Sequence, residues 1–297
     1  MTERCGFVAI VGAPNAGKST LLNQVVGSKI AIVSHKVQTT RTRTLGMVAR
    51  GDSQIIFIDT PGIFEPRRRL DRAMVAAAWG GAVDADLIVL LVDATRGVDK
   101  DVARIVAGLK AQNRTAILCV NKVDAIRKDK LLTLTARLNE EDIFTEIFMI
   151  SALSGDGVDD LVAHLAACVP EGPWHFPSDQ MSDVSDRLLA AEITREKLYL
   201  KLHQELPYSS AVETELWEER KDGSLRIEQT IYVERKSQKG IVIGKGGETL
   251  KEIGQEARVE MESLLECRVH LFLHVKVRER WSEQREHYRN IGLDFID

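Results

Sequence analysis

A chain of 297 residues, 44% of them hydrophobic and 28% charged, has the composition of a globular protein and is long enough for two hydrophobic cores. The formal net charge of −4 does not point to nucleic-acid binding, and an apolar run such as Leu87–Val92 is far shorter than the ~20 residues that cross a bilayer. No charged and then apolar leader precedes Phe7, and the four cysteines lie far apart without a CxxC pair, so export, zinc sites and disulfides are not expected. We therefore expect a soluble, cytoplasmic protein with no transmembrane segment.

Short β-branched runs alternate with stretches of helical periodicity from Phe7 to Val169. The predicted strands are Phe7–Val11, Gln54–Ile58, Leu87–Val92, Ala116–Val120 and Glu146–Ile150. The predicted helices lie near Lys18–Val26, Leu70–Trp79, Asp99–Ala111, Lys130–Asn139 and Val158–Cys168. This alternation predicts an α/β fold with a mostly parallel sheet and helices on both faces.

Pro170–Pro177 contains three prolines and a glycine, which disfavour both a helix and a central strand. We therefore predict a first domain at residues 1–172, a linker at 173–182 and a smaller α+β domain at 183–297. The elements expected in the last domain are a helix at Arg187–Leu206, two strands around a turn at Lys221–Ser224, helices at Lys236–Ile243 and Glu248–Leu265, and a final strand in which Val269, Leu271, Leu273, Val275 and Val277 share one face.

The segment Gly12–Ser19 (GAPNAGKS) matches the phosphate-binding pattern GxxxxGK[ST] between a predicted strand and a predicted helix. Its glycines let successive backbone N–H groups point at phosphate oxygens, and the helix that follows adds the positive end of its dipole. We expect Lys18 to bridge the β- and γ-phosphates and the Ser19 hydroxyl to bind Mg²⁺. The segment predicts a nucleoside triphosphate site.

Three further motifs follow predicted strands and select the nucleotide. Asp59–Gly62 (DTPG) carries a carboxylate that can hold a Mg²⁺-bound water and a glycine N–H that can sense the γ-phosphate. Asn121–Asp124 (NKVD) ends in a carboxylate that can accept two hydrogen bonds from guanine, whereas adenine offers neither donor. Ser151–Leu153 (SAL) can give a backbone N–H to guanine O6. The four motifs in this order predict a GTP site.

These motifs, together with Gln38–Arg41 (QTTR) and Gly244–Gly247 (GKGG), resemble the Era-like family, a branch of the translation-factor class of P-loop GTPases, over essentially the whole chain. The resemblance implies a GTP hydrolase domain followed by a type II KH domain. It also implies that Gln38–Arg41 is part of the first switch, in which Thr39 or Thr40, with Thr40 favoured, completes the coordination of Mg²⁺ when GTP is bound.

The residue after Gly62 is Ile63, where Ras-like enzymes carry the glutamine that orients the attacking water. An isoleucine cannot do this, and the resemblance implies slow intrinsic hydrolysis that is helped from elsewhere. Related GTPases with an asparagine like Asn15 bind K⁺ beside the phosphates, so dependence on K⁺ is a hypothesis for this chain. The alternative is that Asn15 only rigidifies the loop.

A KH domain clamps the backbone of four single-stranded nucleotides with a GxxG turn between two helices, and Gly244–Gly247 lies at such a turn. Between Arg235 and Lys251 there are five basic residues and one acidic residue, although residues 173–297 as a whole carry 24 acidic against 19 basic residues. Ile241, Val242 and Ile243 are candidates to line the groove, and we expect at least one of them to be a core residue. The predicted RNA-binding residues are Lys239, Ile243, Gly244, Lys245, Gly246 and Gly247.

The predicted nucleotide-binding residues are Gly12, Ala13, Pro14, Asn15, Ala16, Gly17, Lys18, Ser19, Thr20, Asp59, Thr60, Pro61, Gly62, Ile63, Asn121, Lys122, Val123, Asp124, Ser151, Ala152 and Leu153. The catalytic residues among the candidates are Lys18, Thr40, Asp59 and Gly62. The Mg²⁺ ligands are sought among Ser19, Thr39, Thr40 and Asp59, and Asn15 is the candidate for K⁺.

The resemblance implies that the RNA is the single-stranded 3′ end of small-subunit ribosomal RNA, bound during assembly of the small ribosomal subunit. It also implies a peripheral association with the inner membrane, with the basic run Arg67–Arg69 as a candidate contact and a solvated loop as the alternative. A monomer is expected. Two other functions stay open: a regulatory GTPase whose C-terminal module binds protein, and a non-hydrolysing RNA scaffold with a structural nucleotide.

Overall fold

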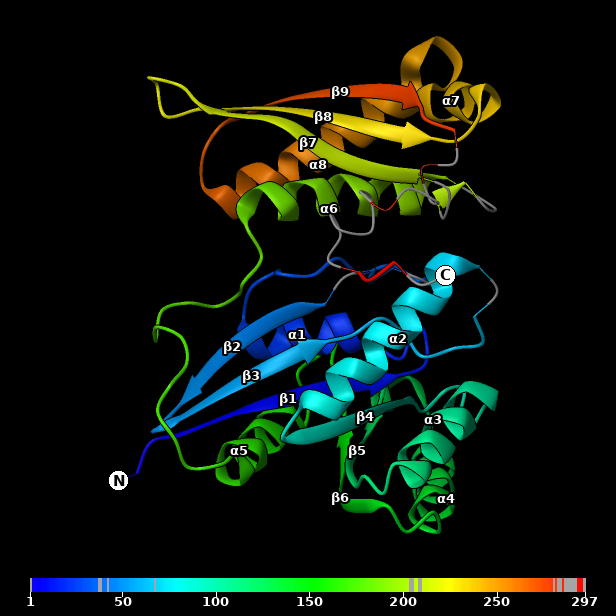
Figure 1. Cartoon of the computed structure of the whole chain (residues 1–297), viewed down its shortest axis with the longest axis vertical. Coiled ribbons are helices and arrows are strands. Elements are labelled where there is room, and N and C mark those ends of the chain that lie inside the picture. The colour runs from blue at the N-terminus through cyan, green and yellow to red at the C-terminus, as the bar shows by residue number, and fades with distance from the viewer. Residues whose placement is uncertain are drawn as a thin grey trace. The chain divides into compact units, whose positions relative to one another are not determined.

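The computed structural model of the chain describes residues 2–36, 39–41, 43–66, 68–202, 206–207, 210–279, 281, 285 and 293–295. The contacts between residues divide the chain into two compact units. The first unit comprises the described residues of 1–31, 40–183 and 291–297, and the second comprises those of 32–39 and 184–290. Figure 1 labels the helices and strands of both units.

Within the described part of the first unit, the strands form one six-stranded sheet in the order β2-β3-β1-β4-β5-β6 (Figure 1). Every neighbouring pair is parallel except β2 and β3. The prediction of an α/β fold with a mostly parallel sheet is therefore confirmed. The strands are β1 (Arg4–Gly12), β2 (Thr44–Arg50), β3 (Ser53–Asp59), β4 (Leu87–Asp93), β5 (Ala116–Asn121) and β6 (Phe144–Ile150).

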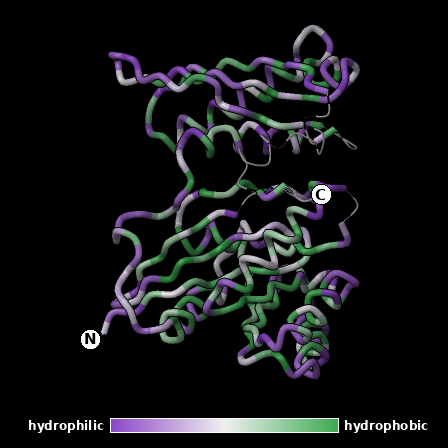
Figure 2. Tube along the Cα trace, viewed as in Figure 1, coloured by the Kyte–Doolittle hydropathy of each residue, from purple (hydrophilic) through white to green (hydrophobic). Residues whose placement is uncertain are grey.

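Helices cover both faces of this sheet, because successive side chains of a strand point to opposite sides. Val8 and Ile10 of β1 belong to one buried core, shared with α1 and α5, whereas Ala9 and Val11 belong to a second core, shared with α2, α3 and α4. Figure 2 shows hydrophobic residues along the strands, as expected for a sheet without a wet face. The helices are α1 (Lys18–Val26), α2 (Arg69–Asp84), α3 (Lys100–Ala111), α4 (Lys128–Asn139) and α5 (Val158–Cys168).

Two of the differences between the predicted and observed elements of the first unit lie at a glycine. Strand β2 is absent from the predicted elements because Gly46 interrupts its pattern. A Cβ at Gly46 would lie 2.6 Å from Leu22 Cδ1, so the lack of a side chain there lets β2 pack closely on α1. Helix α2 runs to Asp84 instead of Trp79. At Gly81 a Cβ would lie 3.1 Å from Thr60 Cγ2, so this glycine keeps the helix close to the end of β3.

The last residues of the predicted linker lie along the outer edge of β2. The Met47 N–H donates to the Met181 carbonyl at 2.9 Å, and the Ser182 hydroxyl donates to the Leu45 carbonyl at 2.9 Å. These bonds satisfy backbone groups that an edge strand would otherwise leave open to pairing with another chain. Residues up to 183 are accordingly grouped with the first unit.

The second unit contains α6 (Asp186–Lys201), β7 (Ser210–Glu219), β8 (Leu225–Val233), α7 (Lys236–Ile243), η3 (Lys245–Gly247), α8 (Glu248–Leu265) and β9 (Val269–Val277). Its sheet has the order β7-β8-β9 over the described residues, antiparallel between β7 and β8 and parallel between β8 and β9. The predicted order of helix, strand, strand, helix, helix, strand is confirmed. Helix α6 ends at Lys201 rather than at the predicted Leu206. Leu202 and Leu206 are both buried in the same core, so the apolar spacing correctly marked buried residues, but those residues are not helical.

One face of the second sheet is covered by α6 and α8. Leu198 of α6, Ile231 of β8 and Ile253 of α8 share one buried core, and Ile193, Ile227 and Met261 share the adjoining one. In the part of the chain that the structure describes, we find no helix with the length and apolar character to cross a membrane.

Candidate functional site

The four nucleotide motifs meet at one edge of the first sheet. Gly12 ends β1, Asp59 ends β3 and Asn121 is the last residue of β5, while Ser151 directly follows β6. Because these strands are parallel, their carboxyl ends lie at the same edge, which is where open α/β sheets bind ligands.

The phosphate-binding loop has the backbone of an anion cradle. Asn15 (φ 64°) and Gly17 (φ 102°) both have positive φ, which turns the chain sharply into α1. The Lys18 ammonium donates to the carbonyls of Gly12 (3.2 Å) and Ala13 (3.0 Å). Burial lowers the pKa of Lys18 to about 8, an effect that the nearby Asp59 carboxylate opposes. A phosphate would supply a negatively charged acceptor to this buried ammonium, which bonds only to neutral carbonyls among the described residues.

Three oxygen-bearing side chains converge beside Lys18. The Ser19 hydroxyl donates to Asp59 Oδ2 at 2.7 Å and lies 2.8 Å from Thr40 Oγ1, which is itself 3.4 Å from Asp59 Oδ2. Asp59 is fully buried, burial raises its pKa, and its Oδ1 has no hydrogen-bond partner among the described residues. Two hydroxyls and a buried carboxylate with an unsatisfied oxygen are the hard oxygen donors that Mg²⁺ prefers, so the residues present fit this ion.

The two threonines considered for Mg²⁺ have different partners. The Thr39 hydroxyl lies 2.6 Å from Ser34 Oγ and donates to the Lys36 carbonyl at 2.7 Å, so the structure brings Thr40 and not Thr39 to Ser19. Gln38, the first residue of the predicted switch motif, lies outside the described residues.

The DTPG motif lies against the phosphate loop. The Ile63 N–H donates to the Gly12 carbonyl at 3.1 Å, and a Cβ at Gly62 would lie 3.0 Å from Pro14 Cα. Thr60 is buried and its hydroxyl donates to the Ile10 carbonyl at 2.9 Å. The Ile63 side chain is fully buried in the core of the unit and has no polar atom to hold a water.

Asn121 links three of the motifs. Its Nδ2 donates to the Ala16 carbonyl at 2.8 Å, and its Oδ1 accepts from the Ala152 N–H at 2.9 Å. Asp124 lies in the short helix η1 (Val123–Ala125) with its side chain exposed, where its carboxylate is free to meet a base. Leu153 is 79% exposed, whereas Ser151 and Ala152 are buried.

Two charged residues of the site are missing from the sequence prediction. The Asp93 carboxylate at the end of β4 accepts from the Lys122 ammonium at 2.6 Å, and that ammonium also donates to the Asn15 carbonyl at 2.9 Å. Burial alone would raise the pKa of Asp93, but hydrogen bonds from Lys122 and Thr95 lower it. Arg96 Nη1 donates to the Pro14 carbonyl at 3.0 Å. The sequence could have indicated Asp93, because it stands at the end of a buried strand, as Asp59 does.

Gly17→Ala is expected to lower the affinity for GDP and GTP by about 10- to 100-fold, because the new Cβ would lie 2.3 Å from Asn121 Nδ2 at a φ that side chains avoid. Fluorescent-nucleotide titration measures the effect. Gly27→Ala is the matched control, since Gly27 also has positive φ (76°) but has no atom within 4 Å of the new Cβ. Equal nucleotide affinity of the two variants would contradict the prediction.

The GKGG turn of the second unit joins α7 to α8. Gly244 (φ 75°), Gly246 (φ 63°) and Gly247 (φ 83°) all have positive φ. A Cβ at Gly244 would lie 2.3 Å from Thr249 Oγ1, whereas nothing lies within 4 Å of the positions at Gly246 and Gly247. The outer part of the turn therefore leaves its backbone open to a close approach by a ligand.

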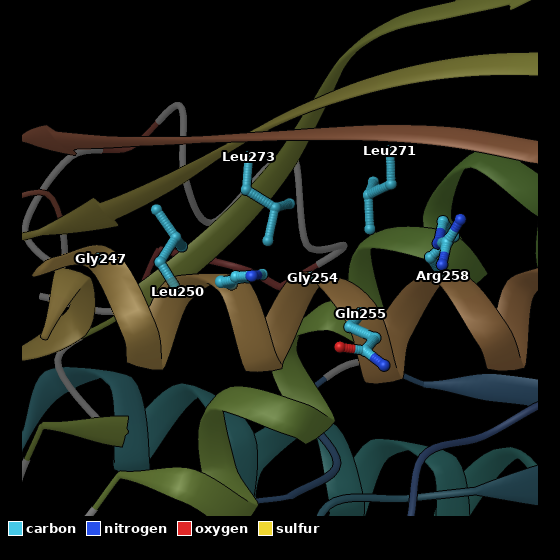
Figure 3. A pocket seen from close by; sticks show the side chains of 8 residues that line it. Gly247, Leu250, Gly254, Gln255, Arg258, Leu271 and Leu273 are labelled. Carbon is cyan, nitrogen blue, oxygen red and sulfur yellow. The ribbon is translucent and has the colours of Figure 1, made fainter.

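A groove of about 460 Å³ extends from this turn between α8 and β9. Figure 3 shows Leu250 of α8 and Leu273 and Leu271 of β9 turned toward it, with Gln255 and Arg258 further along the helix. At Gly254 a Cβ would lie 3.3 Å from Leu273 Cδ1, so this glycine allows the helix to lie close to the strand. The groove lining comprises Gly247, Leu250, Lys251, Gly254, Gln255, Arg258, Leu271 and Leu273.

Of the predicted RNA-binding residues, Gly247 lines this groove. Lys245 and Gly246 are exposed at the turn, and Lys239 is partly exposed on α7. Val242 is fully buried and Ile243 packs against the same core, whereas Ile241 is 58% exposed, so the expectation that at least one of the three is a core residue is met. The walls of the groove are formed by α8 and β9. The sequence analysis placed Leu271 and Leu273 on one face of the final strand, and this pattern could have identified them as groove residues.

Comparisons with known proteins agree with both units. A family model described as 50S ribosome-binding GTPase matches residues 7–122, and one described as KH domain matches residues 205–282. GTPase Era of Rhizobium meliloti is 60% identical over 98% of this chain and 93% of its own length, and GTPase Era of Agrobacterium fabrum is 58% identical over 99% and 93%.

Two solved structures of Era proteins have the same fold as this chain. A variant of the Aquifex aeolicus Era bound to GDP and AlF4⁻ has a TM-score of 0.92 and 41% identity, covering 97% of this chain and 99% of that one. An Era in complex with MgGDPNP and nucleotides 1506–1542 of 16S ribosomal RNA has a TM-score of 0.92 and 41% identity, covering 98% and 99%.

The parallel sheet with its four guanine-nucleotide motifs, followed by a KH fold, defines a GTP-hydrolysing protein with a nucleic-acid-binding type of domain. The predictions of fold and of enzyme class are thereby confirmed. The chain belongs to the Era family of GTPases, as the sequence resemblance indicated.

Proposed function

We propose that this chain binds GTP with Mg²⁺ at the edge of the first sheet, and that hydrolysis switches its binding of single-stranded RNA from the 3′ end of the small-subunit ribosomal RNA during assembly of that subunit. The observation that carries the proposal is the convergence of Ser19, Thr40 and Asp59 on one another at the end of the phosphate loop. The related Era structure with MgGDPNP and 16S ribosomal RNA supports both ligands.

Each residue has a proposed role. Lys18 binds the β- and γ-phosphates, and the Gly62 N–H senses the γ-phosphate. Ser19, Thr40 and Asp59 hold Mg²⁺, directly or through water, and the ion neutralises phosphate charge that develops during hydrolysis. Asp124 and the backbone of Ser151–Leu153 read guanine. We propose the same domain boundaries as the sequence predicts: a GTP-binding domain at 1–172, a linker at 173–182 and an RNA-binding domain at 183–297.

For the RNA, we propose that Gly244–Gly247 clamps the backbone while the groove between α8 and β9 receives bases. Lys245 and Arg258 are exposed at the turn and along the groove, where they can neutralise phosphates. The apolar side chains of Leu250, Leu271 and Leu273 offer surfaces on which bases can pack.

The test is equilibrium binding of labelled single-stranded RNA from the 3′ end of the small-subunit ribosomal RNA, with a GTP analogue, with GDP or without nucleotide, at fixed salt. Tighter binding with the GTP analogue is the expected result. An RNA affinity that does not exceed that for a scrambled RNA of equal length, in all three states, would overturn the RNA assignment and leave the GTPase.

Potassium dependence is a further part of the proposal. Asn15 stands at the tip of the phosphate loop with positive φ, and its carbonyl accepts from Lys122. We expect faster GTP hydrolysis in K⁺ than in Na⁺ at equal ionic strength, measured by phosphate release. Asn15→Ala is expected to remove that difference. Equal rates of the unaltered protein in the two salts would contradict the prediction.

The remaining proposals are a monomer, tested by sedimentation, and a peripheral contact with the inner membrane. For the second, Arg67 of the candidate run lies outside the described residues, and Arg69 at the start of α2 faces the ring of Phe295, with its guanidinium carbon 4.7 Å from the ring centre. Flotation with anionic vesicles tests the contact, and recovery of the protein only in the unbound fraction would contradict it.

A further inference from the structure

A short segment before Thr40 belongs to the second unit, although the chain on both sides of it belongs to the first. Its described residues bond to one another. The Ser34 hydroxyl accepts from the Lys36 N–H at 3.2 Å and lies 2.6 Å from Thr39 Oγ1, which donates to the Lys36 carbonyl at 2.7 Å. These bonds join Ser34, Lys36 and Thr39 to one another, and we call the described residues 33–36 and 39 the turn.

Helix α6 of the same unit holds this turn at three points. The Glu196 carboxylate accepts from the Val33 N–H at 2.8 Å. The Lys36 ammonium donates to the carbonyls of Tyr199 and Leu202 at the end of α6, where the helix dipole favours a cation. Arg195 Nη2 donates to the Thr39 carbonyl.

The guanidinium of Arg195 is held in place by its neighbours on α6. Its side chain is buried, its guanidinium forms an ion pair with Glu192 one turn earlier on α6, and it lies 5.1 Å from the centre of the Tyr199 ring. A guanidinium held by an ion pair and by an aromatic ring loses little freedom when it makes a further charge-assisted hydrogen bond. The Thr39 carbonyl is therefore held in a definite place relative to α6.

We infer that Arg195 is a positioning residue for the GTP site. It fixes the Thr39 carbonyl, and because Thr40 is the next residue, it limits where the Thr40 hydroxyl can go beside Ser19 and Asp59. The side chain of Arg195 does not touch the nucleotide in this role. The inference deepens the proposed function, on which it rests, by naming the residue through which the second unit acts on hydrolysis.

The same helix connects onward to the RNA groove. Glu196, which holds Val33, pairs with Lys197 at 2.9 Å, and Lys197 also pairs with Glu260 of α8. Gln255 and Arg258 of α8 line the groove. A shift of α6 that disturbs the turn at Ser34–Lys36 is thus communicated to the helix that forms one wall of the groove.

The test uses the 297-residue chain with Arg195→Lys. A lysine keeps the charge but cannot bond Glu192 and the Thr39 carbonyl in the same planar geometry. We would measure dissociation of a fluorescent GTP analogue and of GDP, each with Mg²⁺ and with EDTA. The expected result is that the slowing of GTP-analogue dissociation by Mg²⁺ falls about tenfold, the loss of one charge-assisted hydrogen bond, while GDP dissociation changes little.

Two further variants keep the outcome decisive. Lys36→Gln removes the charge and shortens the side chain, which weakens both bonds to the end of α6. The same loss of Mg²⁺-dependent slowing is expected even if Arg195→Lys folds poorly by circular dichroism. Lys201→Ala is the control, since Lys201 on the same helix pairs with Glu252 and Glu256 of α8 and not with the turn. Wild-type Mg²⁺ dependence in Lys36→Gln, and in Arg195→Lys if it folds, would overturn the inference. Because this readout contains no RNA, it decides the inference even if the RNA assignment fails.

Discussion

Asp124→Asn is expected to lower the affinity for GTP by about 10²- to 10⁴-fold and to create affinity for xanthosine triphosphate. The Asp124 carboxylate only accepts hydrogen bonds, and guanine presents two donors, N1–H and the exocyclic amino group. An asparagine places an amide NH₂ against the guanine amino group, which leaves two donors facing each other. Xanthine carries a carbonyl at that position, and the asparagine can donate to it.

Competition binding with GTP and xanthosine triphosphate measures this exchange of preference. Asp129→Asn is the matched control: Asp129 is an exposed carboxylate on α4 that pairs with Arg127, so the same loss of charge occurs nearby without contact to the base. A variant at Asp124 that keeps the wild-type ratio of the two affinities would show that the base is read elsewhere.

Gly246→Asp is expected to lower the affinity for single-stranded RNA by about 100-fold while GTP hydrolysis without RNA stays unchanged. Two effects add. The new carboxylate stands where a phosphate must approach, in a stretch with five basic residues and one acidic residue. The side chain also occupies the open position at the turn, where no atom lies within 4 Å of the Cβ.

Gly223→Asp provides a close control, because Gly223 also has positive φ (77°), also has an open Cβ position and lies in the turn between β7 and β8 of the same unit. The strain and the charge change are thus alike in the two variants. Fluorescence anisotropy with labelled RNA compares them. Equal RNA affinities would favour the alternative in which the C-terminal module binds protein.

Much of the fold could be read from the sequence because its information is local. The runs Leu87–Val92 and Ala116–Val120 are continuously apolar, and the order of elements after residue 183 follows from hydrophobic period and glycine turns. Strand β2 was missed because Gly46 interrupts its apolar pattern. The contacts that hold β2 lie outside its own sequence: it packs closely on Leu22 at Gly46, and its edge is completed by residues near Met181.

The residues of the nucleotide site could likewise be predicted from motifs, because a spacing such as GxxxxGK[ST] determines both the turn and the groups that face a phosphate. Motifs name residues but do not say which of two neighbours turns inward. Thr39 and Thr40 are adjacent and of the same type, and only hydrogen bonds to Ser34 on one side and Ser19 on the other separate them.

By itself, then, the sequence determined the family, the guanine nucleotide, the order of elements and the KH turn, because each depends on residue type and spacing within short stretches. The tertiary structure alone decided that Asp93 anchors Lys122, that α8 and β9 form the groove, and that Arg195 holds the turn before Thr40. Asp93 and Lys122 are 29 residues apart along the chain, and Thr39 and Arg195 are 156 residues apart. Contacts over such separations are set by how packed elements meet, which no local pattern records.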